Sequence, residues 1–240
     1  MTDRATAGRI LRLLTVTPIG SAGVLVGSSS LLGFETNVPA LTEDVDICVP
    51  SELVEREGDA IVASLDAHGW AHEDGTATFV SSDGVTFDLL GHDDPRKGDH
   101  IAGSGRLRVM VFEDLSRLLG SSCATQPVTP LGRVLTPAAF VASKLLTERS
   151  HKGAKDKLQA LLVIAEHEGD TTFRMRLREL FAEVDEVRRE DARASALEAF
   201  LALGQDPAFA DAGAEGYLAY LRDARVGLER LQSLLDGLHA

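Results

Sequence analysis

Residues 23–32 have the sequence GVLVGSSSLL, and residues 44–49 have the sequence DVDICV. Apolar, mostly β-branched residues between two glycines predict a short buried strand in the first stretch. Serine is a common helix N-cap, so a helix is predicted to begin just after Gly27. In the second stretch polar and apolar residues alternate, which predicts a strand with two different faces. Two strands with a helix between them indicate an α/β unit.

Similar patterns extend this unit along the first half of the chain. They predict an amphipathic helix at residues 9–14, a helix at 51–68, a hairpin of strands at 76–80 and 85–90, and a polar, glycine-rich loop at 91–105. After Pro137, apolar residues at helical spacing predict helices at about residues 137–150, 155–168, 171–186, 188–203 and 214–238.

The expected fold class is therefore α/β (α+β). A small mixed sheet with flanking helices would form an N-terminal domain over residues 1–130, and a helical bundle would form a C-terminal domain over residues 131–240.

The composition limits what the protein does. Of 240 residues, 44% are hydrophobic and 25% are charged, which is enough apolar surface for a folded core. The formal net charge of -13 argues against broad binding to nucleic acid or to an anionic membrane, because both require a cationic surface. The two cysteines form no disulfide framework or zinc motif, and neither a signal peptide nor a membrane-spanning run of about 18 apolar residues is recognised. We therefore expect a cytoplasmic location.

The last predicted helix carries an apolar stripe. Its apolar residues recur at alternating three- and four-residue spacing, at Tyr217, Leu221, Ala224, Leu228, Leu231, Leu235 and Leu238. Such a stripe has to be covered, either inside its own bundle or by a second copy of the chain. A monomer and a homodimer through this helix are both open.

Lysines are few and unevenly placed. Four of the five, Lys144, Lys152, Lys155 and Lys157, lie between residues 144 and 157. In an acidic chain that otherwise uses arginine, this cluster suggests a point that meets an anion, although a solvated helix end gives the same pattern. Lys144 is expected on the polar face of its helix.

Three aspartates stand at strand positions where a carboxylate is costly. Asp44 and Asp46 are two residues apart, so their side chains point to the same side of a strand and repel each other. Asp88 lies among apolar neighbours in the strand at 85–90. A hard divalent cation such as Mg²⁺ would neutralise these carboxylates. An exposed strand face, a helix cap or an ion pair would be the structural alternatives.

The junction Gly27-Ser28-Ser29 has the features of a phosphate seat. Backbone N–H groups at the start of a helix are free to bind an anion, and glycine allows the anion to come close. Gly-Ser turns are common, so this motif predicts a phosphate site only in combination with the aspartates that follow it.

Taken in order, Gly27-Ser28, Asp44-x-Asp46 and Asp88 resemble the nucleotidyltransferase superfamily with the DNA polymerase beta-like fold. The segment that begins at residues 135–137 and carries the lysine cluster resembles the helical part that follows the catalytic half in several bacterial branches. These branches include abortive-infection toxins and antibiotic-modifying nucleotidyltransferases. The resemblance covers roughly residues 20–165. The chain departs from the tightest members in a longer loop between Gly27 and Asp44.

The resemblance implies that the N-terminal domain is catalytic. It would transfer a nucleoside monophosphate from an NTP to an acceptor and release pyrophosphate, with two Mg²⁺ ions as cofactor. The acceptor is open, and a small molecule, a tRNA end and a protein are the candidates. The implied metal ligands and catalytic residues are Asp44, Asp46 and Asp88, and the implied nucleotide contacts are Gly27, Ser28, Ser29, Lys144 and Lys155.

Two other classes of function are open at this point. A nucleotide-binding regulatory or antitoxin-like module would keep the fold and turn nothing over. A helical interaction protein would use the α/β half only as a scaffold. Metal-dependent pyrophosphate release separates the enzyme from the silent module, and reversible self-association marks the interaction protein.

Overall fold

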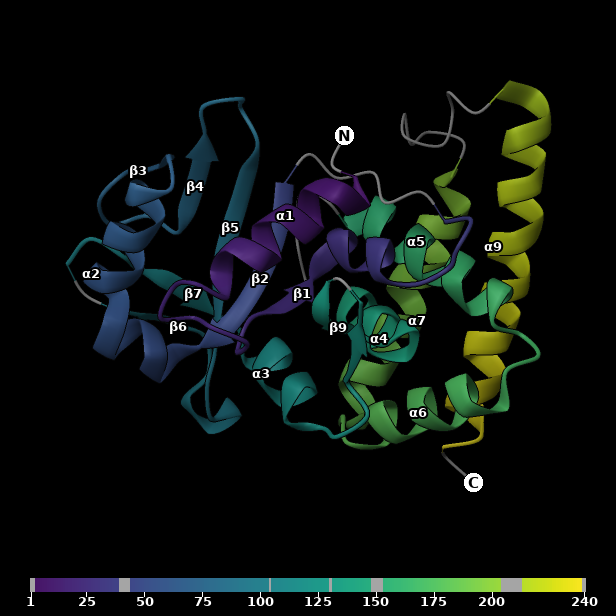
Figure 1. Cartoon of the computed structure of the whole chain (residues 1–240). Helices are drawn as coiled ribbons and strands as arrows, with labels where there is room; N and C mark the ends of the chain where they lie inside the picture. Colours follow the sequence, from purple (N-terminus) through teal and green to yellow (C-terminus); the bar gives the residue numbers. More distant parts are fainter. Residues whose placement is uncertain are drawn as a thin grey trace. The chain divides into compact units, whose positions relative to one another are not determined.

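A computed structural model describes residues 3–38, 44–103, 105–129, 131–147, 153–203 and 213–238 (Figure 1). Contacts within the chain divide it into two compact units, one of residues 1–35 and 40–136 and one of residues 36–39 and 137–240. The first unit holds all the strands of the described residues, and the second holds helices α4 to α9. This confirms the predicted fold class, a mixed sheet with flanking helices followed by a helical bundle.

A mixed sheet organises the first unit. Its main path has the strand order β3-β4-β5-β2-β1-β9-β8, and β7 leaves this path at the end of β5 and pairs with β6. The two central strands, β2 and β5, are parallel to each other, whereas β1 runs antiparallel to β2. The strands are β1 (Val24–Val26), β2 (Asp44–Pro50), β3 (Trp70–His72), β4 (Thr78–Ser81), β5 (Thr86–His92), β6 (His100–Ala102), β7 (Val109–Val111), β8 (Thr125–Val128) and β9 (Gly132–Leu135).

One face of the central strands is buried under two helices. Val45 and Ile47 of β2 and Phe87 of β5 are fully buried, in one cluster with apolar side chains of helices α1 (Arg4–Leu14) and α2 (Ser51–Ala67). Because side chains alternate along a strand, the residues between them face the other side of the sheet. The packed face therefore fixes where the polar face of β2 and β5 lies, and that polar face carries the aspartates.

The remaining helical segments of this unit are short. They are the 3-10 helices η1 (Gly27–Gly33) and η2 (Pro95–Lys97) and the α-helix α3 (Glu113–Gly120). The segment predicted as a helix after Gly27 is thus a 3-10 helix.

Two sequence predictions in this unit need correction. Helix α1 begins at Arg4 and not at Arg9, because the Asp3 side chain accepts the N–H of Thr6 at 2.7 Å and caps the helix. The predicted loop at 91–105 contains the end of β5, then η2 and β6, and β6 pairs with β7. Strand β6 is too short for its periodicity to reveal it, and its pairing partner lies several residues further along the chain.

The second unit is a helical bundle. Its helices are α4 (Pro137–Leu146), α5 (Gly153–Glu166), α6 (Thr171–Ala182), α7 (Glu186–Leu201) and α9 (Gly213–Asp236). Residues 36–38 belong to this unit, because the backbone and side-chain N–H groups of Asn37 donate to Glu166 of α5 at 2.8 and 3.0 Å.

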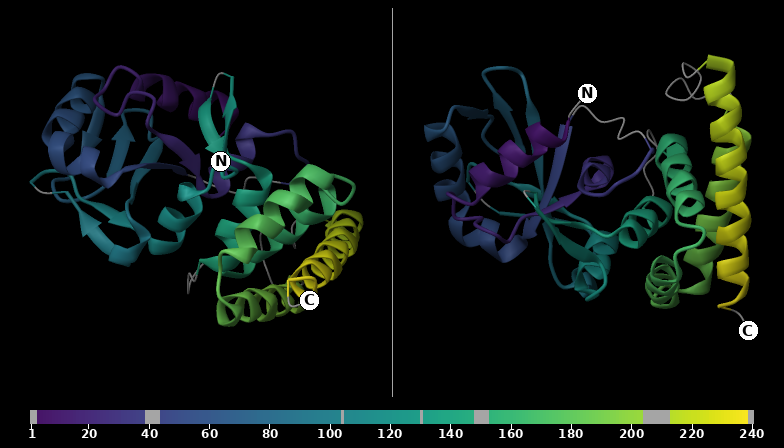
Figure 2. Two further views of the ribbon diagram at one scale, coloured as in Figure 1. Left: turned by 90° about the horizontal axis from the view of Figure 1, so that it is seen from below. Right: turned by 45° about the vertical axis from the view of Figure 1, so that its right-hand side comes forward.

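Helix α9 runs beside α5 and α7 (Figure 2). Its apolar stripe is buried at Ala224, Leu228, Leu231 and Leu235, so its middle and end are covered by the chain's own bundle. Gly227 marks the closest approach, since a Cβ atom there would lie 2.0 Å from the carbonyl oxygen of Leu161 in α5. Only a glycine allows two helix backbones to come this near.

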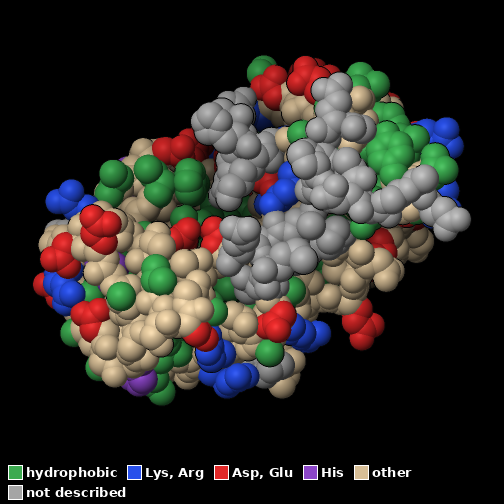
Figure 3. Space-filling model, turned by 90° about the horizontal axis from the view of Figure 1, so that it is seen from above, with side chains coloured by type: hydrophobic (Ala, Val, Ile, Leu, Met, Phe, Trp, Pro, Cys, Tyr) green, Lys and Arg blue, Asp and Glu red, His purple; other side chains and the backbone are tan. Residues whose placement is uncertain are grey.

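Two features of the structure relate to the expected lack of nucleic-acid and membrane binding: the distribution of surface charge and the hydropathy of the helices. On the face drawn in Figure 3, Lys and Arg side chains form small separate groups with Asp and Glu side chains among them. None of the helices of the described residues is long and apolar enough to cross a membrane.

Candidate functional site

Three carboxylates come together on the polar face of the central strands. The parallel register of β2 and β5 places Asp46 directly opposite Asp88, and Asp44 lies two residues earlier on the same face of β2. One oxygen from each of Asp44, Asp46 and Asp88 lies within 4.8 Å of the others. We call these three residues the acidic triad. Within the described parts of the chain, it is the group of three or more His, Cys, Asp or Glu side chains with metal-binding spacing.

The triad is partly exposed and rests on a rigid base. All three aspartates are half-buried, so a ligand can reach their oxygens. The alternate residues of the same strands, among them Val45, Ile47 and Phe87, are fully buried. Strands whose opposite face is packed in this way hold their backbone in place, and with it the points from which the three carboxylates project.

Gly27 fits against one member of the triad. It has a φ of +62°, and it follows Val26, which pairs with Asp46 across the β1–β2 ladder. A Cβ atom at residue 27 would lie 2.1 Å from Oδ2 of Asp46. Glycine is required here for two reasons: the left-handed backbone, and the space that the Asp46 carboxylate occupies.

Ser29 holds the backbone of the same aspartate. Its fully buried hydroxyl donates to the carbonyl of Val26 at 2.7 Å and accepts the N–H of Asp46 at 3.3 Å. The neighbouring Ser30 hydroxyl donates to the carbonyl of Gly27 at 2.8 Å. The serines therefore tie η1 to β1 and β2, a supporting role that the sequence did not indicate. Nucleotide contact by Gly27, Ser28 and Ser29 stays a prediction.

Thr78 supports the third carboxylate. It lies opposite Asp88 in the antiparallel β4–β5 ladder, and its hydroxyl donates to Oδ1 of Asp88 at 2.5 Å. Thr78 is not among the residues predicted from the sequence, although the sequence carries a signal for it. If the predicted hairpin turns about Asp83, residues 78 and 88 are equally far from the turn and must face each other.

Two lysines of the cluster, Lys144 and Lys157, are buried inside the helical unit, whereas Lys144 was expected on a polar helix face. Lys144 is buried, and its Nζ donates to Oδ1 of Asp156 at 2.7 Å and lies 5.8 Å from the ring centroid of Phe140. The placement of Lys144 on a polar face was wrong, because α4 is buried on nearly all sides and α5 supplies the opposite charge.

The other lysines of the cluster lie close by in the helical unit. Lys157 is buried and donates to the carbonyls of Lys144, Leu145 and Thr147 at the end of α4. Lys155 is half-buried, and Lys152 lies outside the described residues. The buried members of this cluster therefore serve the interior of the bundle. Nucleotide contact by Lys144 and Lys155 stays a prediction.

The fit of Gly27 against Asp46 leads to a first prediction. Gly27→Ala is expected to weaken the affinity for Mn²⁺, used as a probe for Mg²⁺, by at least about tenfold, because the new Cβ displaces the Asp46 carboxylate. Titration followed by electron paramagnetic resonance measures the affinity. Gly75→Ala is the matched control, since Gly75 also has a positive φ of 83° but open space around it. Equal Mn²⁺ affinity in the two variants would show that Gly27 does not shape the triad.

The hydrogen bond from Thr78 leads to a second prediction. Thr78→Val removes the donor to Asp88 and keeps the side chain's shape, so Mn²⁺ affinity is expected to fall by about tenfold. Thr78→Ser keeps a hydroxyl and is expected to restore most of the affinity. A Thr78→Val variant that binds Mn²⁺ as tightly as the wild type would remove Thr78 from the site.

The likeness of this chain to known proteins comes from solved structures. No protein-family model and no curated protein sequence matches the chain. Among solved structures, the chain is similar to the CD-NTase CdnG of Bradyrhizobium diazoefficiens, determined in complex with GTP. The TM-score is 0.32 and the sequence identity 13%, and the match covers 100% of this chain and 88% of that chain. At this TM-score the likeness supports no inference about function, which therefore rests on the site itself.

Proposed function

We propose that this chain is a metal-dependent nucleotidyltransferase, which transfers a nucleoside monophosphate from an NTP to an acceptor and releases pyrophosphate. The observation that carries the proposal is the acidic triad. Three carboxylates from two adjacent parallel strands converge within 4.8 Å, beside a glycine turn that leaves room for them. The order of these motifs along the chain, with its resemblance to the superfamily, supports the same activity.

The donor set of the triad fits Mg²⁺. Every donor is a carboxylate oxygen, the ligand type that hard divalent cations prefer, and a bound cation would offset the repulsion among three like charges at this spacing. Asp44, Asp46 and Asp88 would hold the metal. A pair of such ions supplies charge neutralisation for the attacking and leaving oxygens of phosphoryl transfer.

The chain's own residues would supply proton transfer, triphosphate binding and positioning of the metal ligands. Asp88 would accept the proton of the acceptor hydroxyl, and the hydrogen bond from Thr78 would hold its carboxylate in place for this role. The backbone N–H groups at Gly27 and Ser28 would bind the triphosphate, because the first N–H groups of a helical turn point outward from its start and attract an anion. Ser29 keeps Asp46 fixed relative to that turn.

An intact triad argues against a catalytically silent nucleotide-binding module. A module that no longer catalysed transfer would be expected to lose one of the three acids, because binding a nucleotide alone does not need the full set. The net charge of -13 favours a small and cationic acceptor over an RNA acceptor, because a polyanion would be repelled by most of the surface.

Calorimetric titration tests the proposal without knowledge of the acceptor. Each NTP is titrated with Mg²⁺ into the wild type and into the Asp44→Ala/Asp46→Ala variant. We expect at least one NTP to bind only when Mg²⁺ is present and only in the wild type. Absence of binding by every NTP, or equal binding by the double variant with an unchanged circular dichroism spectrum, would overturn the proposal.

A further inference from the structure

The helical unit contains a pocket that the proposed function does not use. It lies where α6, α9 and the end of α5 meet, and its volume is about 320 Å³. Buried apolar side chains of α6 and α9, among them Phe173, Leu177 and Leu231, form its floor. We call it the arginine pocket, and its residues that matter here are Glu168, Phe173, Arg174, Arg178, Arg230 and Leu234.

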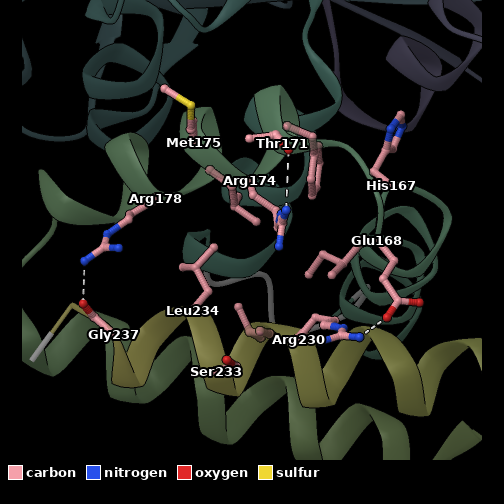
Figure 4. A pocket seen from close by; sticks show the side chains of 14 residues that line it. His167, Glu168, Thr171, Arg174, Met175, Arg178, Arg230, Ser233, Leu234 and Gly237 are labelled. Carbon is pink, nitrogen blue, oxygen red and sulfur yellow. Dashed lines mark hydrogen bonds and ion pairs between the residues drawn. The ribbon is translucent and has the colours of Figure 1, made fainter.

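Three guanidinium groups surround this apolar floor (Figure 4). The Arg174 side chain points into the middle of the pocket. At one end Arg178 donates to the carbonyl of Gly237 at 2.6 Å, and at the other end Arg230 pairs with Glu168. A guanidinium has five N–H donors in a rigid fork, so the bonds that hold Arg178 and Arg230 in place leave further donors on each.

Among the described residues, no acid pairs with the Arg174 guanidinium. Several other arginines of this unit pair with acids, as Arg193 does with Asp236 and Arg222 with Asp223. Within the described parts of the chain, the Arg174 side chain makes one hydrogen bond, to Thr171 Oγ1 at 3.5 Å, which is at the limit of a hydrogen bond. A cation that points over an apolar floor with so weak a contact is available to a ligand.

The charge of the pocket contrasts with that of the chain. Three arginines and one glutamate give the arginine pocket a formal charge of about +2, whereas the whole chain carries -13. An anion that approaches this otherwise repulsive surface is therefore attracted locally. The volume lies at the lower end of the range for small-molecule sites, about 300–1,000 Å³, so the matching ligand is small.

We propose that the arginine pocket binds a small organic anion that combines an apolar portion with a carboxylate or phosphoryl group. The apolar portion would lie on the floor formed by Phe173 and Leu231 and against Leu234. The anionic group would accept from the Arg174 fork, with the free donors of Arg178 or Arg230 beside it. The proposal does not depend on the nucleotidyltransferase activity.

Isothermal titration of simple amphiphilic anions into the full chain tests this site. Octanoate and octyl phosphate are the two probes, which separate a carboxylate ligand from a phosphoryl ligand. Octanamide keeps the apolar chain without the charge, and acetate keeps the charge without the chain. We expect one of the two anionic probes to bind, and octanamide and acetate to bind at least about tenfold more weakly.

Two variants locate the binding. Arg174→Gln is expected to lower the affinity for the tighter-binding probe by about tenfold, because it removes a charged guanidinium from the centre of the pocket. Arg174 is exposed, so the change leaves the bundle packing intact. Arg176→Gln is the matched control, an arginine two residues away on α6 that does not line the pocket, and it should bind like the wild type. No binding of either anion, or equal weakening in both variants, would overturn the proposal.

Discussion

Asp46→Asn is expected to lower the rate of pyrophosphate release by at least about a thousandfold while the fold stays intact. Asp46 is the central member of the acidic triad: it lies opposite Asp88 on β5, shares a face with Asp44 and touches Gly27. Asparagine has nearly the same shape but carries no charge, so the triad loses a ligand for the metal. The hydrogen bond from the Asp46 backbone to Ser29 does not involve the side chain and remains.

The measurement is pyrophosphate release under conditions in which the wild-type chain turns over, together with the Mn²⁺ affinity. Asp59→Asn, which neutralises an exposed carboxylate on α2, is the matched control and should leave both unchanged. If the Asp46→Asn variant still releases pyrophosphate at the wild-type rate, the proposed two-metal mechanism is wrong. Lost turnover with normal Mn²⁺ affinity would also contradict the role assigned to Asp46, since that role is to hold the metal.

Lys144→Ala is expected to lower the free energy of unfolding of the helical unit by about 3 kcal/mol or more. The substitution leaves the buried Asp156 carboxylate without the ammonium that lies 2.7 Å from it. A buried charge that loses its partner costs far more than the pair contributes when it is whole. Urea unfolding followed by circular dichroism, with the wild type under the same conditions, gives the difference.

The double variant Lys144→Met/Asp156→Leu provides the control. It removes both charges and fills the same space with apolar groups, so its stability should lie near that of the wild type. If the single and double variants lose equal stability, packing of the lysine stem and not the unpaired charge is responsible. A Lys144→Ala variant as stable as the wild type would contradict the buried pair altogether.

The sequence predicted the main elements because their signals are local. Alternation in residues 44–49 gave β2, the hairpin around Asp83 gave β4 and β5, and helical periodicity after Pro137 gave the bundle. Several shorter elements were not predicted from the sequence, among them β6, β7 and α3. A strand of three residues has too few positions to show a period, and its stability comes from a partner elsewhere in the chain.

The acidic triad shows how much of a site can be inferred from such patterns. Strand periodicity alone places Asp44 and Asp46 on one face, and it gives Asp88 a place on a second strand. Neither observation says that the two strands are neighbours or in which register they lie. The parallel pairing of β2 with β5, which sets Asp46 against Asp88, is a property of the folded sheet.

Lys144 and Ser29 show where inference from the sequence ends. Periodicity assigned Lys144 to a polar face, but Asp156 of α5 neutralises it inside the bundle. Ser29 stays a predicted phosphate contact, and the structure adds a role that the sequence did not indicate, because its buried hydroxyl accepts the backbone N–H of Asp46. By itself, the sequence determined the longer elements, the fold class and a set of candidate metal ligands, because these depend on neighbours along the chain. Only the tertiary structure decided which charges meet and which are buried, because burial and pairing depend on residues that are distant in sequence and adjacent in space.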